Sequence, residues 1–212
     1  SLSQHGVLFL DELAEFRREV LEGLRQPLED GYLTIGRARQ TVTMPADFLL
    51  VCAMNPCQCG YYGHSLQVCT CTPSQRQRYR SRISGPILDR FDLQVEVPNV
   101  APETYTAPQD PAWGSALIAQ KVENAIQHQQ SRSSVPNGRL GPKALDKAIG
   151  ASPAVHQTLE MVLRNYRLSG RSRTRILRIA RTLADLDDRE AVTSDDILQA
   201  ARLRGLRQNP EF

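Results

Sequence analysis

Residues 6–16 read GVLFLDELAEF, an apolar run that ends in two adjacent acids, Asp11 and Glu12. A continuous apolar run of this length predicts a strand that is buried on both faces, as in a parallel sheet. The carboxyl ends of parallel strands form the edge at which such sheets bind ligands. Two acids at that edge are costly to desolvate unless a cation or a substrate uses them. The stretch therefore predicts an α/β fold with a polar site beyond its first strand.

The first half of the chain contains five further predicted elements. They are a helix at 13–28, a β-hairpin at 31–44, a second buried strand at 48–54, a short helix at 72–83 and a third strand at 93–97. Helical periodicity predicts the first of these, and a period of two predicts the hairpin. Thr72 and Pro73 are typical of a helix start.

A proline-rich segment separates this α/β part from a helical part. Prolines at 98, 102, 108 and 111 indicate a linker and a domain boundary. Helices are predicted at 113–130, 142–149, 153–168, 171–187 and 194–205. The predicted organisation is therefore an α/β domain at 1–98, a linker at 99–112 and an all-α domain at 113–212.

Charge and cysteine usage limit the classes of partner. The net charge is only +3, but residues 132–212 carry 15 basic and 9 acidic side chains, and most of the basic ones are Arg. Arginine suits bidentate phosphate contacts, although ordinary solvated helix faces explain the same composition. No apolar run reaches membrane-spanning length, so no membrane partner is expected. Cysteines without a secretion signal favour a reducing, cytoplasmic location.

Polar residues follow each predicted strand in an order that suits phosphate chemistry. Asp11 can hold Mg²⁺ and Glu12 can polarise an attacking water, while Asn55 can hydrogen-bond that water or a terminal phosphate. Arg90 can neutralise charge that develops during phosphoryl transfer. Each also has an ordinary structural interpretation: acids at a helix start, a turn at Asn55, or a surface ion pair of Arg90 with Asp89 or Asp92.

Four ordered motifs resemble the magnesium-chelatase-like branch of the AAA+ ATPases, and within it the ComM/YifB family. They are GVLFLDELAEF at 6–16, MNPCQCGYYG at 54–63, SGPILDRFD at 84–92 and ARTLADL at 180–186. The resemblance implies a partial AAA+ (P-loop NTPase) core with a parallel sheet and a β-hairpin insertion, followed by a small all-α lid.

The same resemblance assigns roles and implies ATP and Mg²⁺ as cofactors. It makes Asp11 and Glu12 the Walker B pair, with Asp11 on Mg²⁺, and Asn55 the sensor 1 residue. Arg90 matches the arginine finger that acts on an adjacent protomer. Arg171 matches sensor 2 at the start of its helix, with Arg175 as the alternative. The spacing of these two with Arg178 places all three on one helix face. An ordinary solvated basic face is the competing interpretation of Arg175 and Arg178.

The phosphate-binding Walker A loop of the family, G-x-x-x-x-G-K-[ST], does not occur in residues 1–212. The resemblance places it before Ser1, so this chain alone is not expected to hydrolyse ATP. The longer protein is expected to form a ring, a hexamer, that drives branch migration of branched or single-stranded DNA in recombination or natural transformation. Two alternatives remain open: a chelatase or MoxR-type ATPase that remodels a protein partner, and a non-enzymatic, zinc-stapled AAA+ scaffold.

Four clustered cysteines predict a structural zinc site. Cys57-x-Cys59 and Cys69-x-Cys71 can surround Zn²⁺ tetrahedrally and staple the loop between them. His64 is an alternative ligand, and free thiols in a reducing compartment are the competing interpretation. Cys52 lies within a predicted strand and is expected to be buried.

Two groups of arginines are weaker candidates for DNA contacts. Arg37 and Arg39 lie at the predicted hairpin tip, where they would touch phosphates. Arg76, Arg78, Arg80 and Arg82 flank Tyr79 and could contact DNA or a neighbouring subunit instead.

Overall fold

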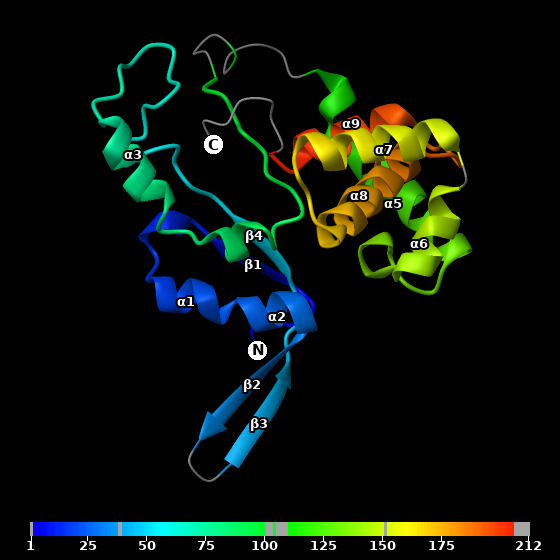
Figure 1. Ribbon diagram of the computed structural model, residues 1–212, viewed down its shortest axis with the longest axis horizontal. Coiled ribbons are helices and arrows are strands. Elements are labelled where there is room, and N and C mark those ends of the chain that lie inside the picture. Colours follow the sequence, from blue (N-terminus) through cyan, green and yellow to red (C-terminus); the bar gives the residue numbers. More distant parts are fainter. Residues whose placement is uncertain (1, 38–39, 101–103, 105–109, 151, 206–212) are drawn as a thin grey trace. The chain divides into compact units, whose positions relative to one another are not determined.

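The computed structural model describes residues 2–37, 40–100, 104, 110–150 and 152–205. The chain divides into two compact units, the first of residues 1–91 with 97–99 and the second of residues 92–96 with 100–212. Figure 1 shows the first unit as a small sheet with helices and a hairpin, and the second as a group of helices. The structure therefore confirms the expected mixture of a parallel sheet, a hairpin and a helical C-terminal region.

The sheet of the first unit contains β1 (Val7–Leu10) and β4 (Leu49–Cys52). They pair in parallel, with Val7 opposite Leu49 and Leu10 opposite Cys52. Leu10 and Cys52 pack against the core of the unit, whereas the opposite face is open: Phe9 is 58% and Leu49 62% exposed. The expectation that these strands are buried on both faces is wrong for this chain, because the core packs against one face alone.

The single helix predicted at 13–28 is wrong. The segment forms a 3-10 turn, η1 (Leu13–Glu15), followed by α1 (Arg18–Gly23) and α2 (Arg25–Asp30). The first break falls at Phe16, whose backbone is extended with ψ of 146°. The second break follows from Pro27, which has no N–H to donate to the carbonyl of Gly23 and therefore suits only the first turn of a new helix.

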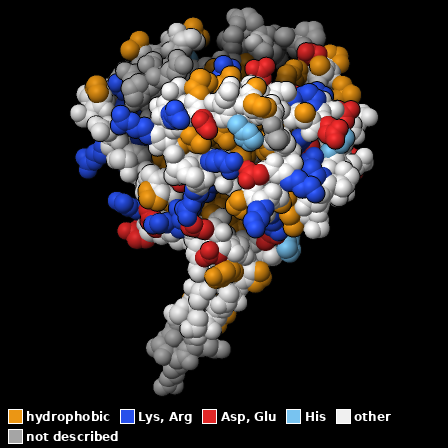
Figure 2. Space-filling view, turned by 45° about the vertical axis from the view of Figure 1, so that its right-hand side comes forward, with side chains coloured by type: hydrophobic (Ala, Val, Ile, Leu, Met, Phe, Trp, Pro, Cys, Tyr) orange, Lys and Arg blue, Asp and Glu red, His pale blue; other side chains and the backbone are white. Residues whose placement is uncertain are grey.

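The predicted hairpin is confirmed. Strands β2 (Tyr32–Arg37) and β3 (Gln40–Pro45) pair antiparallel and project from the body of the first unit (Figure 1). Gly31 ends α2 in the left-handed region, with φ of 73°, which suits a residue without a Cβ. Residues 32–36 and 41–45 carry no charged side chain, and Figure 2 shows the hairpin as a mainly white arm with a grey tip.

Two short helices complete the first unit, α3 (Pro73–Arg80) and α4 (Gly85–Leu88). A capping box starts α3: the Thr72 hydroxyl accepts the Gln75 N–H, and the Gln75 side chain accepts the Thr72 N–H at 2.8 Å. The buried core of the unit is formed by Leu13, Ala14, Leu21, Tyr79, Ile83 and Ile87.

The third strand predicted at 93–97 is wrong. Residues 93–96 belong to the second unit and Val97 to the first, and Gln94 makes an isolated bridge with Arg204. Its N–H donates to the carbonyl of Leu203 at 2.5 Å. Apolar content alone favoured a strand here, but a strand requires a partner along its length, and Val95 is 67% exposed.

The second unit is helical. Its elements are η3 (Pro111–Trp113), α5 (Ser115–Arg132), η4 (Asn137–Arg139), α6 (Pro142–Ile149), α7 (Pro153–Asn165), α8 (Gly170–Leu186) and α9 (Ser194–Leu203). These confirm the helices predicted after the linker, and α6 has the predicted bounds. Its core is a single apolar cluster that includes Leu145, Leu159, Ile176, Leu177 and Ile197, all at most 2% exposed.

Candidate functional site

The acids and the amide predicted to handle phosphate lie at one edge of the sheet. Asp11 follows β1 directly and Asn55 lies just beyond β4, and these strands are parallel neighbours. Backbone hydrogen bonds extend past the strand ends, because Ala53 donates to Leu10 and Leu13 donates to Ala53, both at 2.9 Å. The turn that carries Asp11 and Glu12 is therefore fixed beside the end of β4, and all three polar side chains are exposed at this edge.

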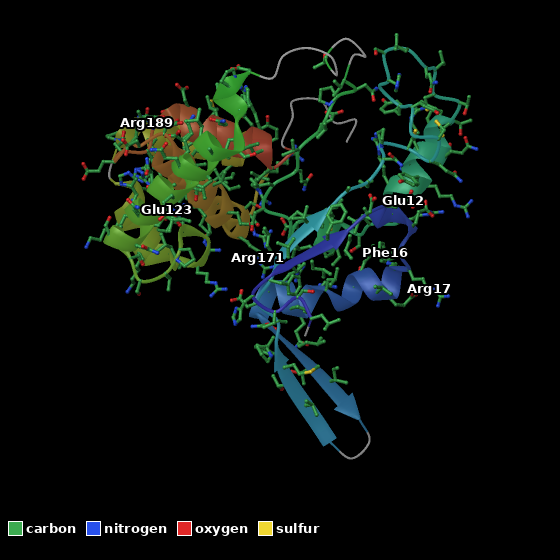
Figure 3. The ribbon with its side chains drawn as sticks, turned by 180° about the vertical axis from the view of Figure 1, so that it is seen from behind. Glu12, Phe16, Arg17, Glu123, Arg171 and Arg189 are labelled. Atoms are coloured by element: carbon green, nitrogen blue, oxygen red, sulfur yellow. The ribbon has the colours of Figure 1, made fainter. Side chains whose placement is uncertain are left out.

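Glu12 has an unusual backbone conformation. Its φ of 50° and ψ of 47° lie in the left-handed region, which costs a residue with a Cβ about 1 kcal/mol. The Glu12 N–H donates to the Asp11 carboxylate at 2.8 Å, and Figure 3 labels Glu12 at the carboxyl end of β1. Local strain of this kind tends to occur at functional sites, where the surrounding structure enforces it. The strained turn is an independent reason to regard this edge as a binding site.

Arg90 lies just after α4 and is held inside the first unit. One guanidinium nitrogen donates to the carbonyl of Pro86 at 2.7 Å, and another pairs with the carboxylate of Glu29 on α2. The Arg90 side chain is only 8% exposed. A guanidinium that is withdrawn from water in this way needs a carboxylate partner. Any contact between Arg90 and another subunit would require it to leave Glu29.

The three arginines predicted to share a face of α8 have different environments. Arg171 is exposed in the first turn of α8 (Figure 3). Arg175 lies 3.6 Å from the Asp92 carboxylate, with 16% of its side chain exposed. Arg178 donates two hydrogen bonds to the carbonyl of Leu140, at 2.7 and 3.2 Å, and burial lowers its pKa. Arg175 and Arg178 therefore do not form a solvated basic face, because their side chains contact Asp92 and the carbonyl of Leu140.

The motif ARTLADL proves to carry a buried polar network whose role the sequence did not suggest. Arg181 is fully buried and donates to Asp185 at 3.0 Å and to the carbonyl of Glu190 at 2.5 Å. Arg132 reaches the same carboxylate with two bonds, of 2.7 and 3.1 Å. A sequence signal did exist: Arg181 and Asp185 follow Leu177 at helical spacing, on the face that packs into the core.

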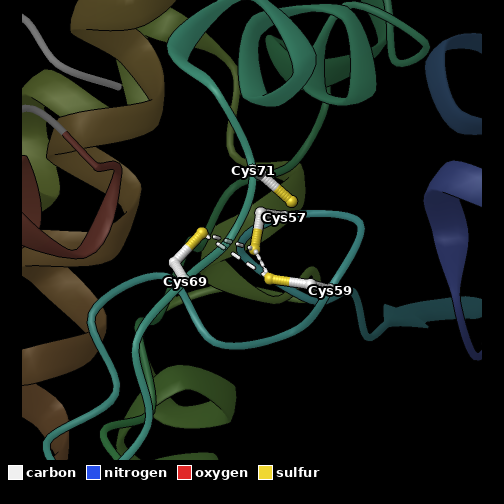
Figure 4. A group of neighbouring side chains, drawn as sticks. All are labelled: Cys57, Cys59, Cys69 and Cys71. Atoms are coloured by element: carbon white, nitrogen blue, oxygen red, sulfur yellow. Dashed lines mark hydrogen bonds between the residues drawn. The ribbon is translucent and has the colours of Figure 1, made fainter.

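The four clustered cysteines converge as predicted. All four Sγ atoms lie within 4.8 Å of one another, and three of the separations are 3.4, 3.6 and 3.7 Å (Figure 4). Tetrahedral Zn²⁺ with four Zn–S bonds of about 2.3 Å places its sulfurs about 3.8 Å apart, so the donor set and its spacing fit the ion. The cluster members are Cys57, Cys59, Cys69 and Cys71.

The thiols of the cluster differ in pKa, and the His64 ring of the same loop makes hydrogen bonds of its own. A hydrogen bond from the backbone of Tyr61 is the main cause that lowers the pKa of Cys59 to about 5, which favours the thiolate that metals require. Burial raises the pKa of Cys69, so the cluster without an ion does not hold four thiolates at once. The His64 Nδ1 accepts N–H groups from Leu66 and Gln67, at 3.0 and 3.1 Å. His64 therefore shapes the loop and is not a member of the cluster.

Two of the arginines on α3 hold the cysteine loop in place. Tyr62 lies beneath the guanidinium groups of Arg76 and Arg80, whose Cζ atoms are 4.4 and 5.3 Å from the ring centre. Arg76 also donates to the carbonyl of Cys71 at 2.6 Å. These two side chains therefore have an internal role in the first unit. Cys52 lies outside the cluster, half-buried, and burial raises its pKa to about 11.

The hairpin arginines are placed only in part. Arg37 is the last residue of β2, opposite Gln40 in the register, and Arg39 lies outside the described residues. Their predicted contact with DNA phosphates stays a prediction.

Comparison with known proteins identifies the family. Residues 1–105 match the family model of the magnesium chelatase subunit ChlI, and residues 112–204 match that of the ChlI C-terminal region. The chain therefore belongs to the magnesium chelatase ChlI-like family, and it is homologous to the ComM and YifB proteins.

Individual relatives match almost all of this chain but extend far beyond it. The competence protein ComM of Haemophilus influenzae and the uncharacterized protein YifB of Escherichia coli are each 38% identical over 206 residues. An uncharacterized protein of Mycobacterium tuberculosis is 34% identical over 208 residues. These alignments cover 96 to 97% of this chain and 40 to 41% of each relative. Among the described helices, none combines the length and apolar character needed to span a bilayer.

Proposed function

We propose that this chain forms the catalytic edge and the helical lid of an AAA+ ATPase that acts on DNA. The observation that carries the proposal is the convergence of Asp11, Glu12 and Asn55 at the carboxyl edge of two adjacent parallel strands. Ligands bind at this edge in open α/β sheets. Family membership supports an ATPase but leaves the substrate open.

The groups at the edge suit ATP hydrolysis assisted by magnesium. Carboxylate and amide oxygens are the hard donors that Mg²⁺ prefers, so the residues present fit the ion. Bound Mg²⁺ would neutralise charge on the terminal phosphates. Asp11 would hold the ion, Glu12 would take a proton from the attacking water, and Asn55 would orient that water.

Two arginines would complete the site from outside the strand ends. Arg171, exposed in the first turn of α8, is the proposed sensor 2 residue, with Arg175 as the alternative. Arg90 is the proposed finger toward the nucleotide of an adjacent protomer in a hexameric ring. It would have to exchange its ion pair with Glu29 for a phosphate oxygen, so ring assembly and nucleotide binding would compete with a contact inside the subunit.

DNA is the proposed substrate, branched or single-stranded, and the proposed location is the cytoplasm. The support is the likeness to a competence protein together with an arginine-rich helical unit. In the proposed reaction ATP turnover drives branch migration through movement of the lid and the hairpin.

Replacement of Glu12 tests the proposal in the longer polypeptide that supplies a phosphate-binding loop. Glu12→Gln should lower ATP turnover by about 10² to 10⁴-fold, because it removes the general base, while ATP binding persists. Glu19→Gln, an exposed glutamate on α1, is the matched control and should keep full turnover. Unchanged turnover in Glu12→Gln would refute Glu12 as the general base, and a wild type without turnover would refute the ATPase assignment. A wild-type turnover that branched DNA does not stimulate would refute the DNA assignment.

A further inference from the structure

The first unit contains a hollow that the proposed ATPase site does not use. It has a volume of about 460 Å³ and lies between the segment that follows Glu12 and the end of α3. Its lining residues are Ala14, Glu15, Phe16, Arg18, Arg78, Ser81 and Arg82. We call it the arginine hollow.

The charges of the arginine hollow are not balanced. Glu15 is its one acid and is engaged by Arg82, which donates to it at 2.8 Å and to the carbonyl of Ala14 at 3.1 Å. Arg82 is thereby fixed at the wall. Arg78 is exposed, and Arg18 is 70% exposed and forms a loose ion pair with Glu22, whose carboxylate lies 4.0 Å from its Nε. Arg78 and Arg18 are therefore available to an anion, because the exposed ion pair of Arg18 with Glu22 is weak and easily exchanged.

The sequence around the α3 wall of the hollow adds only positive charge, whereas residues 11–22 on the other wall contain five acids and two arginines. From Phe48 to Leu88 the chain contains four arginines and no aspartate or glutamate. Zn²⁺ with four thiolates would carry a formal charge of −2, but none of the four cysteines lines the arginine hollow. Clefts lined by one sign of charge concentrate ligands of the opposite sign.

An aromatic side chain accompanies these arginines. Phe16 lines the hollow and keeps 37% of its surface exposed. The extended backbone of Phe16 and Arg17 separates η1 from α1 and brings this ring to the surface; Figure 3 labels both residues between Glu12 and α1. Proteins that bind single-stranded nucleic acid combine exposed aromatic rings with cationic side chains, since bases stack on the ring and phosphates pair with the cations.

We propose that the arginine hollow binds single-stranded nucleic acid, with Arg18 and Arg78 on backbone phosphates and Phe16 stacked on a base. An acidic peptide would satisfy the two arginines equally well, but it would leave the exposed ring without a planar partner. The inference rests on the proposed function only in taking DNA as the substrate. It adds a site on the first unit that needs neither ATP nor the hairpin.

Fluorescence anisotropy of a labelled 20-nucleotide oligothymidylate, titrated with the 212-residue chain without nucleotide, tests the site. The double variant Arg18→Gln/Arg78→Gln should weaken binding about tenfold or more at low salt. The slope of log affinity against log salt should shrink by about 0.7 for each arginine removed. Phe16→Leu should weaken binding about tenfold with an unchanged salt slope, because it removes stacking without removing charge. Arg164→Gln, on α7 and 82% exposed, is the matched control and should bind as the wild type does.

Several outcomes would overturn the inference. The inference is wrong if the wild-type chain binds no oligothymidylate. It is also wrong if the double variant binds the oligonucleotide as tightly as Arg164→Gln does. Polyglutamate that displaces the oligonucleotide and binds more tightly would assign the hollow to an acidic protein instead. Circular dichroism identifies any variant that fails to fold, and Phe16→Leu then provides the independent test. ATP turnover by Glu12→Gln in the longer polypeptide tests the proposed function separately, since it does not involve the arginine hollow.

Discussion

Arg181 and Asp185 are charged residues that the helical unit buries almost completely, with exposures of 0% and 1%. Their charges are compatible with burial because Arg132 and Asn137 also bond to the Asp185 carboxylate, and because carbonyls accept hydrogen bonds from both terminal nitrogens of Arg181, although its Nε has no partner among the described residues. The network joins α5, η4 and α8. A buried pair of this kind is costly to break from one side, since the partner charge remains buried.

Asp185→Asn should lower the free energy of unfolding by about 3 kcal/mol at pH 7. Burial by itself raises the pKa of Asp185, but hydrogen bonds from Arg132 and Asn137 and the charge of Arg181 outweigh it and hold the pKa below the ordinary 3.8. A lowered pKa stabilises the fold above pH 3.8 and ceases to do so as the pH falls through the folded-state value. Urea unfolding between pH 7 and pH 2 should therefore show the difference between wild type and variant shrinking below about pH 4.

Glu160→Gln is the control for this experiment. Its carboxylate is 67% exposed and lies 3.6 Å from Arg164, so it should change stability by less than about 1 kcal/mol. If Asp185→Asn lowers the free energy of unfolding by as much at pH 2 as at pH 7, the carboxylate charge is not what stabilises the unit.

Among the elements, the cysteine loop depends least on an apolar core. Leu66 and Val68 are 76% and 88% exposed, whereas Cys57 is fully buried. The loop is held by the cysteine cluster and by Tyr62 beneath two arginines of α3. A segment with so little buried apolar surface requires a crosslink or a metal to keep one conformation.

We expect the protein purified without chelators to contain about one zinc ion per chain. Cys59→Ser and Cys71→Ser should each lose the ion, because a structural tetrahedral site needs four ligands. Loss of zinc should make residues 60–68 sensitive to limited proteolysis. Cys52→Ala, which removes a thiol outside the cluster, should retain the metal. Elemental analysis reports the zinc content, and metal-free wild type that resists proteolysis would contradict the expectation.

At the level of the whole molecule, each of the two units has its own core, but the first unit has an incomplete sheet. Two parallel strands leave one apolar face exposed, including Val7, Phe9, Leu49 and Val51. Parallel sheets are ordinarily covered on both faces. The chain spans about 40% of the length of its relatives.

The 212-residue chain alone should show no ATP turnover above background in a phosphate-release assay. Its residues include the acids and the amide that we propose for catalysis, but none of its sequence matches the glycine-rich loop whose N–H groups and lysine hold the phosphates. Turnover should occur in a longer polypeptide that contains this loop, and Glu12→Gln should abolish it there. Turnover by the 212-residue chain that survives Glu12→Gln would point to a contaminating enzyme, whereas turnover that Glu12→Gln removes would contradict the need for the loop.

The sequence by itself determined the elements whose signals are local. Apolar runs predicted β1 and β4, a period of two predicted the hairpin, and the helix predicted at 142–149 has the observed bounds of α6. The spacing of the four cysteines also predicted their convergence, because a short loop keeps both pairs close.

Only the tertiary structure decided which residues meet across long stretches of chain. It split the helix expected at 13–28 and left residues 93–97 without a strand partner. It also paired Arg90 with Glu29, 61 positions away, and buried the charges of the ARTLADL motif. Periodicity reports how a segment folds and which of its faces is apolar, but it does not report which carboxylate a guanidinium will reach. That depends on the packing of elements that are distant in the sequence, and packing determines both the burial of a charge and the partner that makes the burial possible.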